Sequence, residues 1–231
     1  MIRGALTFVV GLAVAAAPAA AAARMDPKNP TCPESPDWGP KTPMKFSLVE
    51  RDGKRVLLGE GVIDDALVAR LKAALDQHKP DEIWLRSAGG NARAGNAAGK
   101  LIRESPMVTR IPAGWACFSA CNFVFMGGRA RFVDPGGLFM VHMFTHTADR
   151  GAIEGEVLRG TDNAVALIGD IEQDSALLAS EDNDFLIRMG VSRKLLTEVM
   201  YQQKAVADSG GSTRRCLTQA EALKYNVANA Q

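Results

Sequence analysis

The feature that most constrains the fold is a strand, a glycine turn, a helix and a second strand in direct succession. Residues 82–87 have the composition of a short strand, and the turn Ser87-Ala88-Gly89-Gly90 follows them. The helix predicted over 93–104 has an apolar stripe at helical spacing, and 107–112 is the next predicted strand. Such a unit pairs its strands in parallel with a right-handed crossover. The pattern therefore predicts an α/β protein.

Strands and helices alternate over the rest of the chain as well. Asp52-Gly53 is a two-residue turn that favours positive φ, so a hairpin is predicted between 44–50 and 54–58. The other predicted elements are a helix ending before Pro80, a helix over 119–127, strands at 129–133 and 138–142, a long helix over 162–189, and a last helix from Thr218 to Tyr225.

The N-terminus predicts export. Residues 1–23 contain one arginine, a short apolar run and the motif Ala21-Ala22-Ala23, which is typical of a cleaved signal peptide. The run is shorter than a bilayer span needs. We therefore expect a periplasmic or secreted protein of about 208 residues (231 minus 23). Residues 24–43, with six prolines, are predicted to be a flexible lead-in, and 44–231 a single domain.

Charge and cysteines limit the partners further. Losing Arg3 takes the formal charge from +1 to 0, so no basic field is present to recruit nucleic acid. Four cysteines in an exported chain predict disulfides with three connectivities. Cys117 with Cys121 is the local pairing, and Cys32 would then join Cys216. A zinc site ranks lower because the chain has no C-x-x-C spacing.

Three features could support chemistry. The glycine turn can direct backbone N–H groups at an anion, although such turns are often chosen only for packing. Ser119 stands within Gly114 to Cys121, a segment of small residues that enters an apolar helix, where a serine is most often just a cap. His142 ends an apolar strand, where most histidines are structural.

The order of these motifs from residue 59 to 229 resembles the Clp protease proteolytic subunit and the crotonase superfamily. The matching segments are Gly61-Val62-Ile63-Asp64, Ile83 to Gly90 with Gly95 beyond it, the serine turn at 114–121, the strand that ends in His142, and Leu217 to Val227. The resemblance implies repeated ββα units that form a spiral domain, with additional C-terminal helices.

The resemblance also implies roles for individual residues. Ser119 would be the nucleophile and His142 the general base, and the N–H groups of Gly89 or Gly90 and of Ala120 would form an oxyanion hole. Direct alignment places Arg214 where the family has its aspartate. Asp208, six residues upstream, is a weak substitute, so a Ser-His dyad and an inactive site both stay open.

Export and the residues near the candidate site also indicate which partners and cofactors to expect. An exported chain does not meet the cytosolic ATP-driven unfoldase, so proteolysis would be ATP-independent. The crotonase branch is disfavoured because no acidic residues stand near the glycine turn, and we expect no cofactor. His142 and His146 have metal-ligand spacing, but His78 is the only other histidine, so no metal is expected.

Two functions therefore stay open. The first is a serine hydrolase of the peptidase class, acting on a peptide or protein substrate. The second is a catalytically silent member of the same fold that binds peptides or an envelope partner. Helix 162–189 has enough apolar surface to join subunits of a homo-oligomer, or else to pack on its own domain.

Overall fold

The computed structural model describes residues 24–147, 149–206 and 212–231. Its larger sheet has five strands in the order β3-β4-β5-β6-β8. The predicted hairpin is confirmed, because β3 and β4 are antiparallel and both turn residues, Asp52 and Gly53, have positive φ. The remaining neighbours are parallel. The strands are β3 (Lys45–Arg51), β4 (Lys54–Glu60), β5 (Glu82–Arg86), β6 (Val108–Ile111) and β8 (Ala130–Val133).

A second sheet of three strands lies beside the first. It contains β7 (Ala116–Phe118), β9 (Leu138–His142) and β10 (Arg214–Cys216) in the order β10-β9-β7. The strands predicted at 129–133 and 138–142 belong to different sheets, because β8 joins the larger sheet and β9 the smaller one. From β6 to β9, successive strands alternate between the sheets: β6 and β8 belong to the larger sheet, and β7 and β9 to the smaller one. This arrangement confirms the predicted α/β class with ββα repeats.

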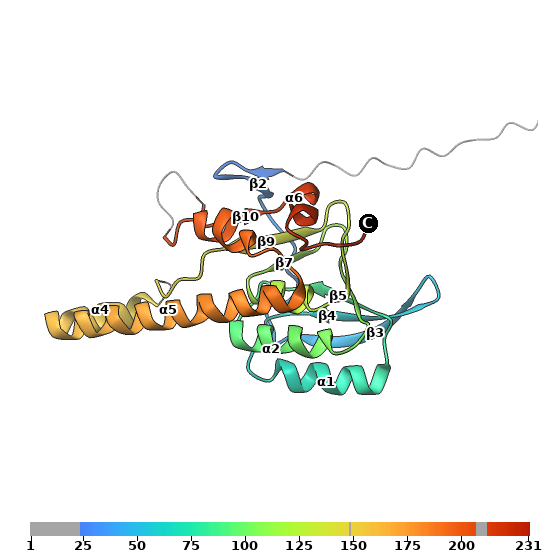
Figure 1. Ribbon diagram of the computed structural model, residues 1–231, viewed down its shortest axis with the longest axis horizontal. Coiled ribbons are helices and arrows are strands. Elements are labelled where there is room, and N and C mark those ends of the chain that lie inside the picture. Colours follow the sequence, from blue (N-terminus) through green and yellow to red (C-terminus); the bar gives the residue numbers. More distant parts are fainter. Residues whose placement is uncertain (1–23, 148, 207–211) are drawn as a thin grey trace, which may run out of the picture.

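Helices cover the larger sheet and bring the serine turn against it. In Figure 1, α1 (Leu67–His78) and α2 (Ala92–Arg103) lie on one side of this sheet, and the smaller sheet lies on the other. α2 approaches α3 (Ala120–Met126) closely, because a Cβ at Gly95 would lie 2.5 Å from the Ala120 carbonyl oxygen. Fully buried side chains fill the core, among them Leu57, Ile83, Leu85, Ile111, Phe125 and Phe139.

The predicted long helix is present as α5 (Thr161–Met189), and Gly190 ends it in the left-handed conformation. Its C-terminal half packs in the core through Leu178, Phe185, Leu186 and Met189. Its N-terminal half projects from the body with α4 (Arg150–Leu158), a helix we did not predict (Figure 1). A π-helical turn, η1 (Leu195–Val199), and a 3-10 turn, η2 (Met200–Gln202), follow. The predicted last helix is present as α6 (Gln219–Lys224), and a capping box of Thr218 with Glu221 begins it.

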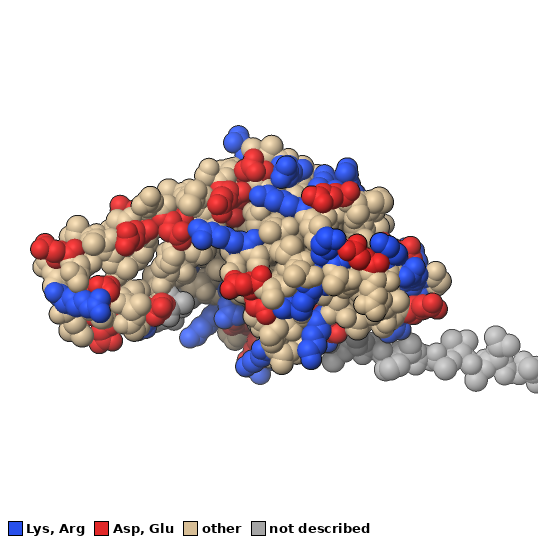
Figure 2. Space-filling view, turned by 90° about the horizontal axis from the view of Figure 1, so that it is seen from below, with Lys and Arg blue, Asp and Glu red and all other residues tan. Residues whose placement is uncertain are grey.

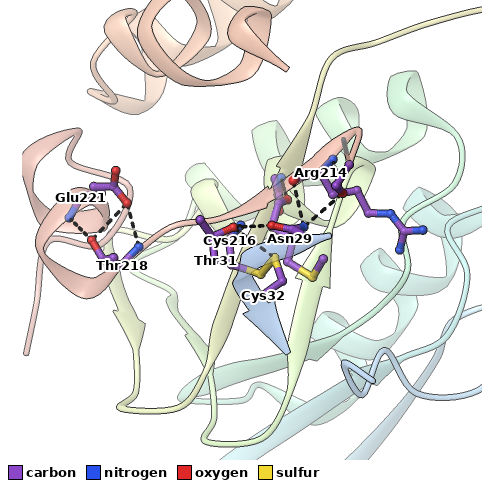
Figure 3. The surroundings of a disulfide bond; sticks show 10 residues. Asn29, Thr31, Cys32, Arg214, Cys216, Thr218 and Glu221 are labelled. Carbon is purple, nitrogen blue, oxygen red and sulfur yellow. Dashed lines mark hydrogen bonds between the residues drawn. A yellow bond between two sulfur atoms is a disulfide. The ribbon is translucent and has the colours of Figure 1, made fainter. Parts of the chain in front are cut away.

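The proline-rich segment is more ordered than we predicted. Within the lead-in that we predicted to be flexible, β1 (Met25–Asp26) and β2 (Asn29–Pro33) form an antiparallel pair. Figure 3 shows β2 beside β10, where the Cys32–Cys216 disulfide joins them. Asn29 Nδ2 donates to the Arg214 carbonyl at 2.9 Å. The correction has a simple cause, because a covalent bond and long-range hydrogen bonds order a segment that has no local preference of its own.

The surface is mixed in charge. On the face shown in Figure 2, lysine and arginine side chains are interspersed with aspartate and glutamate over the body and along the projecting arm. Among the described residues, no helix has both the length and the apolar character that a membrane span requires. The predicted signal peptide, residues 1–23, lies outside the described residues.

Candidate active site

Ser119 occupies the sharp entry from β7 into α3. Its backbone has φ 57° and ψ −124°, a conformation that residues with a Cβ seldom adopt. Its side chain makes no capping hydrogen bond with the helix. The ordinary explanation for a serine at a helix start, a cap, therefore does not hold here. A strained backbone at such a position is typical of functional sites.

His142, the last residue of β9, reaches the serine across the turn. Its Nε2 lies 2.8 Å from Ser119 Oγ, and its Nδ1 lies 2.7 Å from the carbonyl oxygen of Met143. A carbonyl can only accept, so Nδ1 of the neutral ring must carry the proton. Nε2 then presents its lone pair to the serine hydroxyl, which donates. The arrangement is that of a hydroxyl facing a base.

The surroundings of His142 favour its neutral form. Burial lowers the pKa of the imidazole, the Met143 carbonyl partly opposes this, and the positive charge of Arg214 lowers it again. The ring also packs on Phe118, with 4.8 Å between centroids. The imidazole is therefore unprotonated at pH 7 and available to accept a proton.

The chain departs from a Ser-His-Asp triad at the position of the aspartate. Arg214 of β10 stands directly opposite His142 in the strand register. Its guanidinium lies near Trp38 and Phe118, 5.6 and 5.7 Å from their ring centroids. Asp208 lies outside the described residues. Among the described residues, the partner of His142 Nδ1 is a main-chain carbonyl, which sequence motifs do not reveal.

The glycine turn after β5 lies against the serine turn. Ser87 exchanges backbone hydrogen bonds with β7, and a Cβ added to Gly89 would lie 2.7 Å from Ser119 Cβ. The Gly89 N–H donates to Ser87 Oγ at 3.0 Å, so it is already engaged. Within the described ranges, the N–H groups of Gly90 and Ala120 have no acceptor. Of the predicted oxyanion donors, these two are free.

Both predicted disulfides are present. Cys117 and Cys121 are bonded across the serine turn with Cα atoms 5.3 Å apart, and both side chains are fully buried. The bond ties the last strand residues before Ser119 to the first turn of α3. Neither thiol is available as an alternative nucleophile in this state.

A pocket opens beside Ser119 and His142, between α3, α5 and the turns that follow α5. Its walls are mainly apolar, with Phe123, Met126, Leu178, Leu186, Leu195 and Met200 among them. Two buried polar side chains, Asn122 and Asp182, also line it. Burial, reinforced by the nearby charge of Glu181, raises the pKa of Asp182 to about 7.

Sequence reasoning missed Asp182, although a signal existed. Position 182 falls on the same helical face as Leu178 and Phe185, so it is one acidic residue in a buried stripe. Acidic residues are almost never fully buried without a partner. A carboxylate at such a position should have been singled out as a candidate site residue.

The second histidine of the H-x-x-x-H spacing is directed elsewhere. His146 lies in the loop after β9, and its Nε2 is 3.0 Å from Asp174 Oδ2 of α5. In the described ranges, no three histidine, cysteine, aspartate or glutamate side chains are grouped as metal ligands.

The chain is similar to known proteins in structure, but its sequence identity to them is low. No family model matches the chain, and no curated protein does either. One similar solved structure is a point mutant of ClpP1 from Listeria monocytogenes, with 15% identity, a TM-score of 0.48, and coverage of 76% of this chain and 89% of that one. Another is a point mutant of 1510-N, a membrane-bound stomatin-specific protease, with 16% identity, a TM-score of 0.46 and 76% coverage of each chain. The chain is thus similar to both proteins over about three quarters of its length.

Proposed function

We propose that this protein is an exported serine hydrolase that cleaves peptides or proteins without ATP. The observation that carries the proposal is the 2.8 Å contact between Ser119 Oγ and His142 Nε2, with Nδ1 held by the Met143 carbonyl. The nucleophile, the base and the group that orients the base form a continuous hydrogen-bonded chain. This is the geometric requirement for an activated serine.

The reaction follows from these atoms. Ser119 Oγ attacks the carbonyl carbon of a peptide bond while its proton passes to His142 Nε2. The oxyanion accepts hydrogen bonds from the free N–H groups of Gly90 and Ala120, aided by the positive end of the α3 dipole. His142 then gives its proton to the leaving amine, and an acyl-serine remains. Water then attacks the ester carbonyl while its proton passes to His142 Nε2. The imidazolium gives that proton to Ser119 Oγ as the C–O bond breaks and the acid leaves, which restores both residues.

A main-chain carbonyl orients His142 but stabilises the imidazolium less than a carboxylate would. Arg214, which lowers the pKa of His142, also disfavours that imidazolium. The proposed enzyme is therefore slower than a full triad. The mechanism needs no metal or organic cofactor.

Export is supported by residues 1–23 and by two disulfides, which form in oxidising compartments. Association is supported by the projecting arm, formed by α4 and the N-terminal half of α5. It exposes apolar side chains, of which Leu158 is 80% and Val165 62% exposed. We propose that this arm joins copies of the chain. Light scattering of the purified protein tests this, and a monomer that stays monomeric on concentration would refute it.

One observation favours a second candidate, a peptide-binding protein without catalysis. Arg214 stands opposite His142, and among the described residues no carboxylate reaches Nδ1. In that case the pocket would still receive a peptide, but Ser119 would not turn it over.

Labelling with a fluorophosphonate probe separates the two candidates. The purified protein is compared with Ser119→Ala and His142→Ala, and with two matched controls, Ser47→Ala on the exposed face of β3 and His146→Ala. Labelling that persists in the controls and is lost in the two site variants supports the hydrolase. A wild type that is folded by circular dichroism yet unlabelled would refute it and favour the binding protein.

A further inference from the structure

We infer that Asp182 makes the pocket beside Ser119 selective for a positively charged substrate side chain of the lysine or arginine class. The inference deepens the proposed function, because it names the residue type that the hydrolase would accept next to the cleaved bond. It rests on two unpartnered acceptors, on the apolar walls around them, and on their position beside the proposed nucleophile.

Asp182 is the first acceptor. Its side chain lies on the buried face of α5 and is only 7% exposed, yet it lines the pocket that contains Ser119 and His142. Within the described ranges, no donor of the protein forms a hydrogen bond or ion pair with its carboxyl group. Burying a carboxylate without a partner is costly, and a carboxylate accepts hydrogen bonds but donates none. A cation in the pocket would relieve this cost.

Asn122 provides the second acceptor. Its Nδ2 donates to the Met140 carbonyl at 2.6 Å, which fixes the orientation of the amide. Its Oδ1 is buried and has no hydrogen-bond partner among the described residues. The other hydrogen-bonding side chains of the pocket, Ser119 and His142, are bonded to each other. When Asp182 is ionised, the unsatisfied groups of this pocket are therefore both acceptors, and a donor on the substrate would satisfy them.

The walls suit the rest of a basic side chain. Phe123, Leu178 and Leu195 are buried and offer an apolar surface to methylene groups, while an ammonium or guanidinium group meets Asp182. The open space is about 40 Å³, enough for one water. A lysine or arginine side chain is larger than this space, so side chains that line the pocket must rearrange when the substrate binds.

The charged and titratable neighbours come from three elements. Glu181 precedes Asp182 on α5, Tyr201 on η2 interacts with it electrostatically, and His142 at the end of β9 lines the same pocket. Glu181 is acidic, and Tyr201 and His142 are neutral. These three groups therefore place no positive charge near Asp182. A cationic ligand therefore meets no competing cation among these groups.

The test compares two peptidyl diphenyl phosphonates that are identical except that one has a lysine side chain and the other norleucine, which lacks the ammonium group. The rate of Ser119 modification is measured for protein expressed from the full-length chain. We expect lysine to react faster by on the order of tenfold, the effect of one good ionic contact. In Asp182→Asn the ratio should fall to about one. Asp184→Asn, on the exposed face of the same helix, should keep the wild-type ratio.

A second measurement on the wild type needs no variant. The lysine-to-norleucine ratio should rise with pH as Asp182 ionises, and protonation of His142 cancels from the ratio because it affects both probes equally. A ratio that is the same in wild type and Asp182→Asn, or faster reaction of norleucine in the wild type, would overturn the inference.

Failure of the proposed function is distinguishable from failure of this inference. If no phosphonate or fluorophosphonate modifies Ser119, the hydrolase proposal fails, and selectivity is measured by calorimetry as binding of product peptides that end in lysine or norleucine. Tighter binding of the lysine peptide that Asp182→Asn abolishes would support the inference. Equal binding of the two peptides would refute it.

Discussion

Replacing Asp182 with asparagine should change how the stability of the protein depends on pH. In the folded chain the pKa of Asp182 is raised to about 7, from 3.8 for a free aspartate side chain. Between these values the folded protein holds a proton that the unfolded chain has released. Unfolding therefore releases a proton, so raising the pH favours unfolding. The stability is present below pH 3.8 and is lost as the pH rises through about 7.

The size of the effect follows from the pKa difference. Each pKa unit corresponds to about 1.4 kcal/mol, so the wild type loses about 4 kcal/mol across this range through Asp182 alone. Asparagine does not ionise and should lose none of it. For a chain of this size the difference corresponds to a change in Tm on the order of 10 °C.

The assay is thermal and urea unfolding of wild type and Asp182→Asn at pH 4 to 8. Other carboxyl groups titrate equally in both proteins, so the difference between the two curves isolates Asp182. We expect the variant to gain stability relative to wild type as the pH rises. Asp184→Asn, on the exposed face of the same helix, should run parallel to wild type. Parallel curves for Asp182→Asn as well would refute the reasoning, since they would mean that the carboxyl is not isolated in the folded state.

Three further predictions concern the framework and the base. Replacing Cys32 and Cys216 with serine should lower the free energy of unfolding by about 4–5 kcal/mol, because the disulfide closes a loop with a sequence separation of 184 residues. Denaturation of the oxidised parent and of the variant measures this loss. Arg214→Gln should raise the pKa of His142, because it removes a positive charge near the imidazole. The acid limb of the pH profile of the fluorophosphonate labelling rate should therefore move to higher pH. An unchanged acid limb would show that the charge of Arg214 does not affect the imidazole. Arg131→Met should lower the free energy of unfolding, measured in urea, by about 3 kcal/mol or more. The reason is that the buried guanidinium donates to the carbonyls of Gly128, Asn226 and Val227 at 2.8 Å each. A loss below about 1 kcal/mol would contradict this role.

Local patterns in the chain predicted the elements well where a few neighbouring residues decide the outcome. Asp52-Gly53 favours one turn type, Gly190 ends a helix, and Thr218 with Glu221 forms a capping box. The apolar stripe of α2 and the long helix α5 are equally local. Their free energies depend on residues within a few positions, so a reader of the sequence can find them.

The order of motifs along the chain also predicts Ser119 and His142 as site residues. Their contact depends on β7 and β9 pairing in parallel, with Phe118 opposite Met140. That register places the serine turn and the end of β9 side by side. No local pattern specifies it, because it is set by packing between segments more than 20 residues apart.

By itself, the sequence determined the α/β class, the turns and caps, and the residue types available for chemistry, since each depends on local backbone preference and apolar spacing. Only the tertiary structure decided that a Met143 carbonyl holds His142, that the lead-in is anchored on β10, and that Asp182 and Asn122 face the pocket beside Ser119. The physical reason is that hydrogen bonding and burial at these positions depend on distant segments. A main-chain carbonyl has no sequence signature, and a carboxyl group becomes exceptional only when its surroundings exclude water.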